Sequence, residues 1–249
     1  MITDSWFYAA AIPAILLVGI SKGGFGSGAG MFATPLIALT VPIPQAAAIL
    51  LPILCVMDVA GLWAYRGTYA RGHLRTLLVG GVIGVMLGTL TFRYVNEAWI
   101  RIVLGGMALG FVAQRYWVRK VVEPAAPSAR RGLFWSMVSG LTSTIAHAGG
   151  PPMSIYLLPL RLDKAVMVGT TVVFFAVINA VKLVPYAWLG LFDARNLSTS
   201  AVLAPLAPVG IWIGVKLMRR IPEALFYRIC YAILLVVGAK LAWDGVARL

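Results

Sequence analysis

The chain has 249 residues, of which 61% are hydrophobic and only 12% charged, and its formal net charge is +13. A soluble domain is about half apolar and a quarter charged, so this composition, with a mean hydropathy of +0.90, excludes a soluble enzyme and indicates an integral membrane protein. The basic residues are interspersed with apolar runs of bilayer length and form no patch with aromatic residues, which argues against a nucleic-acid partner.

Ten apolar segments follow one another along the chain, at about 6–20, 29–41, 46–65, 76–92, 99–117, 132–146, 151–160, 165–189, 199–217 and 224–243. Because a bilayer is crossed by about 20 residues, the first two segments of each half are too short to span it. We therefore expect an all-α polytopic membrane protein with a single transporter domain, 1–249. Repeat one covers about 5–120, a linker 121–132, and repeat two about 133–249, each with a pair of short, broken or re-entrant helices and three transmembrane helices.

The two halves match at an offset of 121 residues, which places Gly19 on Gly140, Gly28 on Gly149 and Asp58 on Asn179. If each short pair returns to the side from which it entered, the second repeat is inverted. This topology puts 14 of the 21 Lys and Arg residues in the cytoplasm and leaves Arg93, Arg101, Arg195, Lys240 and Arg248 outside. The excess of basic residues inside predicts that both termini are periplasmic. The N-terminus lacks the basic region of a secretory signal, so we expect an uncleaved protein of the bacterial inner membrane.

The stretch "SKGGFGSGAG", residues 21–30, interrupts the first apolar region with five glycines and a lysine. Glycine disfavours a helix, and a lysine at bilayer depth is costly unless it is paired or solvated. A helix that begins near Gly28 would direct backbone N–H groups toward an anion. The candidate substrate-binding residues here are Ser21, Lys22, Gly26, Ser27, Gly28 and Gly30. The alternatives are that the glycines only permit close helix packing and that Lys22 extends to the interface.

The second break, "TSTIAHAGGPPMS" at 142–154, predicts a half-helix that starts at Pro151, because proline suits the first helical turn. The candidates in this stretch are Thr142, His147, Gly149 and Gly150. His147 is either a ligand for a proton or anion or a hydrogen-bonded core histidine.

Three further candidates lie inside long apolar segments. Lys182 shares a helical face with Asn179 and Tyr186, and we expect Lys182 and Asn179 to bind substrate. Asp58 is the only acid in the middle of an apolar segment, and it either takes part in proton coupling or neutralises Lys22 or Lys182. Cys55 and Cys230 have no metal-ligand spacing, so neither a metal site nor another cofactor is expected.

Three stretches carry a resemblance to a known family: "SKGGFGSGAGMFATPLIAL", "PQAAAILLPILCVMDVAGLWAYRG" and "HAGGPPMSIYLLPLRLDKAVMVGTTVVFFAVINAVKLVPY". They resemble the TauE/SafE sulfite exporter family, anion transporters of the toluene sulfonate uptake permease type. The resemblance implies an inner-membrane permease, an exporter, for sulfite or organosulfur anions such as sulfoacetate, driven by the proton gradient. Its partners would be the anion, protons and membrane lipid. The resemblance leaves open whether the chain forms a homo-oligomer. The second break departs from the family's Gly-rich form by reading "HAGGPP".

Two other functions remain as alternatives. A passive anion channel would use the same residues without alternating access. An intramembrane hydrolase would use Ser27 with His147, but the Gly-x-Ser-Gly pattern of such enzymes needs a glycine where this chain has Phe25. We therefore expect a transporter and not an enzyme.

Overall fold

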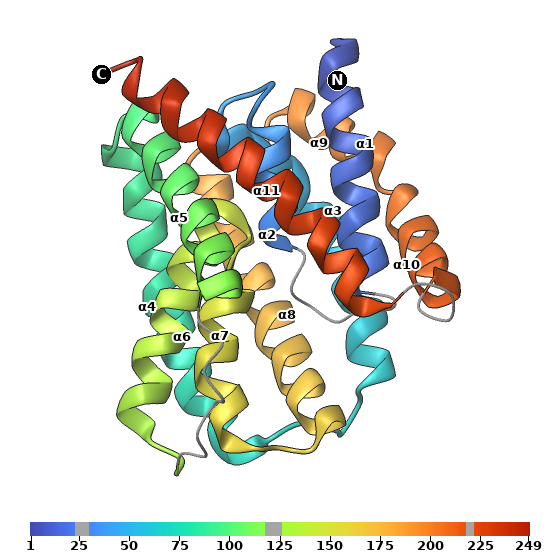
Figure 1. Ribbon diagram of the computed structural model, residues 1–249, viewed down its shortest axis with the longest axis vertical. Helices are drawn as coiled ribbons and strands as arrows, with labels where there is room; N and C mark the ends of the chain where they lie inside the picture. Colours follow the sequence, from blue (N-terminus) through green and yellow to red (C-terminus); the bar gives the residue numbers. More distant parts are fainter. Residues whose placement is uncertain (23–29, 118–125, 218–221) are drawn as a thin grey trace.

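The computed structural model describes residues 1–22, 30–117, 126–217 and 222–249. Within these ranges the chain is helical and contains no strand, which confirms the all-α expectation. The helices are α1 (Ser5–Ile20), α2 (Gly30–Ile37), α3 (Ile43–Ala64), α4 (Arg71–Tyr94), α5 (Glu97–Trp117), α6 (Ala129–Ala146), α7 (Gly150–Leu157), α8 (Lys164–Trp188), α9 (Ala194–Leu203), α10 (Leu206–Leu217) and α11 (Glu223–Val246), with a 3-10 turn at Leu158–Leu160 (Figure 1).

Five apolar stretches of the described chain are long enough to cross a membrane: Ile43–Ala64, Arg71–Tyr94, Ala165–Trp188, Ala194–Leu217 and Arg228–Val246. The first of them, α3, is the most deeply buried inside the protein. Its side chains Ile49 and Ile53 join Phe7 of α1 and Phe32 of α2 in the main hydrophobic core. The chain is therefore a membrane protein whose core is built around α3.

Short helices form the first pair in each half, as expected: α1 and α2 have 16 and 8 residues, and α6 and α7 have 18 and 8. Within each pair the two helices pack against each other. The α1–α2 pair enters the molecule from the end that holds both termini, whereas the α6–α7 pair enters from the opposite end (Figure 1). The joints between α3 and α4 and between α7 and α8 also lie at that opposite end, and they carry exposed arginines at 66, 71 and 161.

Between α6 and α7 one residue adopts the left-handed backbone conformation, and a new helix begins shortly after it. His147 ends α6 with φ of 51°, and the N–H of Ala148 donates to the carbonyl of Thr142 at 3.2 Å, a typical helix C-cap. α7 then begins at Gly150, one residue before the predicted Pro151, with a proline in its first turn. The sequence signal for this half-helix is thus confirmed to within one residue.

Close glycine packing joins α4 to α6. A Cβ atom on Gly84 would lie 2.0 Å from the carbonyl oxygen of Met137, and one on Gly88 would lie 3.1 Å from that of Leu141. These positions exclude any side chain, because the two backbones are in direct contact. The interface therefore depends on glycines one helical turn apart on α4.

An equivalent packing joins α10 to α1. A Cβ atom on Gly214 would lie 2.3 Å from the carbonyl oxygen of Ile20, and one on Gly210 would lie 3.2 Å from that of Leu16. Leu16 and Ile20 are the residues that the 121-residue offset aligns with the two α6 carbonyls just described. The offset thus relates the α6 and α1 sides of the two contacts, whereas the glycines on α4 and α10 are 126 residues apart.

One expected span is interrupted. The sequence predicts a continuous segment at 199–217, but the structure ends α9 at Leu203 and begins α10 at Leu206. Pro205 lies between them, and because it has no N–H it cannot continue the hydrogen-bond ladder of α9.

Candidate functional site

An ion pair and an amide connect the two halves of the chain at Asp58. The ammonium of Lys22, directly after α1, donates to Asp58 Oδ1 at 2.5 Å, and Asn179 Nδ2 of α8 donates to Asp58 Oδ2 at 2.5 Å. Asp58 is only 6% exposed, whereas the Lys22 side chain keeps 21% of its surface accessible. Both carboxylate oxygens are therefore bound, one by a residue from each half.

Lys182 lies one helical turn after Asn179 on α8 and is completely buried. Its ammonium donates to the Ser143 carbonyl and the Ser143 hydroxyl, both at 3.1 Å, and contacts His147 Nδ1 at 3.0 Å. An ammonium has three donors, so these three acceptors satisfy it. Among the described residues its side chain forms no ion pair with a carboxylate.

The tautomer of His147 follows from its two neighbours. The Lys182 ammonium can only donate, so His147 Nδ1 accepts, and Nε2–H then donates to the Ala47 carbonyl at 3.0 Å. In this arrangement the imidazole is neutral. His147 therefore links α6 to α3 and at the same time accepts a hydrogen bond from the buried cation.

We call Lys22, Asp58, Asn179, Lys182, Ser143 and His147 the central cluster. Two ammonium groups and one carboxylate give it a formal charge of +1 inside a membrane protein. A buried charge without a partner is costly, and an anion of opposite sign lowers that cost. The cluster is thus chemically suited to a small anion, which the ammonium groups would contact by charge-assisted hydrogen bonds.

The structure describes only some of the other candidate residues in the first break. Gly26, Ser27 and Gly28 lie outside the described residues. Ser21 is fully buried next to Lys22, and Gly30 is the first residue of α2.

In the second break, Thr142 donates its hydroxyl within its own helix, to the Val138 carbonyl at 2.9 Å. Gly149 precedes α7, and the Ser139 hydroxyl donates to its carbonyl at 2.7 Å. A Cβ on Gly149 would lie 2.6 Å from the Phe175 ring, so this glycine permits close packing, as one alternative had it. Gly150 forms the first residue of α7.

Sequence reasoning missed Ser143, which supplies two of the three Lys182 contacts. The signal was available, because Ser143 and His147 are four residues apart on one face of a helix. Tyr186, one turn beyond Lys182, is also fully buried, and its hydroxyl donates to the Thr144 carbonyl at 2.6 Å. These two contacts fix α8 against α6.

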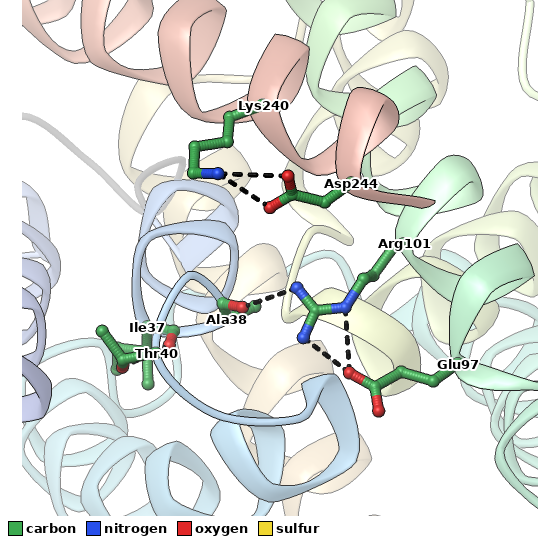
Figure 2. Close-up of polar contacts among 7 residues, drawn as sticks. All are labelled: Ile37, Ala38, Thr40, Glu97, Arg101, Lys240 and Asp244. Carbon is green, nitrogen blue, oxygen red and sulfur yellow. Dashed lines mark hydrogen bonds and ion pairs between the residues drawn. The ribbon is translucent and has the colours of Figure 1, made fainter. Parts of the chain in front are cut away.

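Arg101, which the expected topology places in an outer joint, is only 5% exposed. Figure 2 shows its guanidinium between the Glu97 carboxylate and the Ala38 carbonyl. The bonds to Glu97 measure 2.9 and 2.6 Å and the bond to Ala38 3.0 Å. A positive charge at a helix C-terminus is favourable, so Arg101 attaches the end of α2 to α5. Lys240 and Asp244 form a separate, more exposed ion pair nearby (Figure 2).

Comparisons with known proteins agree with this description. The family model described as "Sulfite exporter TauE/SafE" matches residues 11–241. A protein of Cupriavidus necator described as "Probable sulfite/organosulfonate exporter TauE" is 22% identical over 173 residues, which cover 68% of this chain and 67% of the relative. No solved structure matches. The family consists of transporters rather than enzymes, which rules out the hydrolase alternative. Because its model covers nearly the whole sequence, the chain belongs to the TauE/SafE sulfite exporter family.

Proposed function

We propose that this chain is a proton-coupled secondary transporter that carries a small sulfur-containing anion, sulfite or an organosulfonate, together with a proton across the bacterial inner membrane. The observation that carries the proposal is the +1 charge of the buried central cluster, with the Lys182 ammonium held by neutral acceptors only. The family description supports sulfite, and the printed name of the Cupriavidus relative supports sulfite or an organosulfonate as substrates.

Binding of the anion requires a rearrangement at Lys182. Lys22 uses a donor on Asp58, and Lys182 uses all three of its donors on protein acceptors. An oxyanion that contacts Lys182 therefore replaces Ser143 or His147 as an acceptor. We include Ser21, Asn179 and the backbone N–H groups near 149–150 as further donors to its oxygens.

Proton coupling follows from the two negative charges that meet at Lys22. An anion on the Lys22 ammonium lies close to the Asp58 carboxylate, and a proton on Asp58 removes the repulsion between them. Protonated Asp58 raises the formal charge of the cluster from +1 to +2, which strengthens the binding of the anion. The affinities for proton and anion are then linked.

Two inverted repeats provide the route for alternating access in this proposal. The α1–α2 and α6–α7 pairs enter from opposite ends of the molecule, and the central cluster takes residues from both halves (Figure 1). The paired glycine contacts of α4 with α6 and of α10 with α1 support the same relation. Substrate sites where broken helices of two inverted repeats meet are typical of secondary transporters. The distribution of basic residues favours a periplasmic location for both termini.

Transport by purified protein in liposomes tests this proposal. The wild-type chain should accumulate sulfite or sulfoacetate against its gradient when a pH gradient is imposed, and Lys182→Gln should abolish this uptake. Lys240→Gln, which removes an exposed lysine from its pair with Asp244, serves as the control and should transport normally. If Lys182→Gln does not fold, Lys22→Gln replaces it. Flux that only dissipates an anion gradient, without accumulation, would instead identify a passive channel.

A further inference from the structure

An apolar groove runs along the outside of the molecule between α4 and α8, with a volume of about 540 Å³. Val82 and Met86 of α4 form one wall, and Val184 and Trp188 of α8 form the other. Thr89, the one hydroxyl in its lining, donates to a carbonyl of its own helix at 2.7 Å. Apart from the indole N–H of Trp188, the groove is lined by apolar groups, and it suits a hydrocarbon chain.

Arg93 lies at one end of this groove. Arg93 follows Thr89 by one helical turn on α4, and its guanidinium lies over the Trp188 ring, 4.4 Å from the centroid. Both side chains are exposed, and Trp188 keeps 61% of its surface accessible. Tryptophan and arginine at the end of a spanning helix are typical of the interface between hydrocarbon and headgroups.

The groove and the arginine beyond its end together match one leaflet of a bilayer. From Val82 to Arg93 the helix advances about 16 Å at about 1.5 Å per residue, which is roughly half of a hydrocarbon core of about 30 Å. When Arg93 lies at the headgroup level, the far end of the groove therefore reaches the bilayer midplane. This places the cation at the depth of a lipid phosphate and the apolar walls at the depth of an acyl chain.

We propose that this groove binds an anionic glycerophospholipid, with one acyl chain between α4 and α8 and the phosphate on Arg93. The charge of Arg93 favours a phosphate over an uncharged occupant. A second copy of the chain suits the groove less well, because the protein carries 21 basic residues and only 8 acidic ones. The site is separate from the central cluster and does not depend on the transported substrate.

Native mass spectrometry of the delipidated protein, titrated with dipalmitoyl phosphatidylglycerol, tests the site. Arg93→Gln should weaken binding of one lipid about fivefold, the value of one basic residue at a membrane surface. Val184→Trp, at a position that is 74% exposed, should fill the groove and also weaken binding. Arg71→Gln is the matched control, because Arg71 is an exposed arginine on the same helix that also stacks on a ring, Tyr69 at 5.7 Å. It should leave the affinity unchanged.

Two further arms separate the sources of binding. Dihexanoyl phosphatidylglycerol tests the headgroup alone and palmitate tests the chain alone, and each should bind more weakly than the long-chain phospholipid. Equal loss of affinity in Arg93→Gln and Arg71→Gln, or loss in neither, would overturn the proposal. So would a dimer that Val184→Trp abolishes while lipid binding persists, because the groove would then be an interface between copies. If Val184→Trp does not fold, Met86→Trp, at a position 63% exposed, tests the same wall.

Discussion

Replacing Asp58 by asparagine removes the negative charge of the central cluster while keeping the size of the side chain. The substituted amide can accept the Lys22 hydrogen bond through its oxygen, and Asn179 can rotate its own amide to accept where it now donates. The hydrogen bonds of this region are therefore retained, and the formal charge of the cluster rises from +1 to +2. We expect the protein to fold and its anion affinity to change.

The size of the change follows from the geometry of the ion pair. An anion oxygen about 3 Å from Lys22 Nζ lies within roughly 5.5 Å of Asp58 Oδ1, because the ammonium and carboxylate are 2.5 Å apart. Each negative charge is spread over several atoms, so the centres of the two charges lie roughly 5.5–8 Å apart. At an effective dielectric constant of about 20, they repel each other by about 2–3 kcal/mol. Without this repulsion, anion binding should tighten by about 30- to 150-fold. Water around the partly exposed Lys22 screens the interaction, so the lower value is expected.

The assay measures the dissociation constant of sulfoacetate, a permanent anion near neutral pH, at several pH values in the wild type and in Asp58→Asn. Asp58→Asn should bind sulfoacetate more tightly than the wild type and should lack the pH dependence that proton coupling gives to the wild type. In liposomes the variant should exchange substrate but no longer accumulate it. Asp244→Asn, in the exposed pair with Lys240, is the control. If Asp58→Asn keeps both the pH dependence and the accumulation of the wild type, Asp58 is a fixed counter-ion and the coupling argument is wrong.

Three other changes test the architecture. Alkaline phosphatase fused after Leu249 should be active and a fusion at Pro127 inactive; the opposite pattern would refute the topology. Gly84→Ala should lower the free energy of unfolding by about 1–3 kcal/mol through its clash with α6, whereas Gly106→Ala, with open space around it, should not lower thermal stability, because alanine favours a helix more than glycine does. Arg101→Met should cost about 2 kcal/mol in thermal unfolding, because a carbonyl at the end of α2 loses its partner; unchanged stability would refute that role.

Much of the fold was predictable because apolar segments and helix-breaking residues are local signals. The short helix pairs, the half-helix at Gly150 and the burial of Lys182 beside Asn179 all followed from segment length and helical spacing. Pro205 was an equally local signal for the end of α9, but the apolar run around it favoured one continuous span.

The partners within the site were not predictable to the same degree. The sequence left open whether Asp58 neutralises Lys22 or Lys182, because the choice depends on where the end of α1 meets α3. Likewise, the Lys182 contact with Ser143 depends on how α8 crosses α6, and the burial of Arg101 depends on the end of α2 returning to α5. Such contacts join residues far apart in the chain and are set by helix packing rather than by local pattern.

The most direct test of the central claim is the affinity of the purified protein for sulfite and sulfoacetate, measured by titration calorimetry in the wild type and in Lys22→Gln. A charge-assisted hydrogen bond contributes about 1.5–3 kcal/mol, so the variant should bind about 10- to 150-fold more weakly. Lys240→Gln, an exposed lysine with its own aspartate partner, should bind like the wild type. Wild-type affinity in a folded Lys22→Gln protein would contradict the assignment of the central cluster as the anion site.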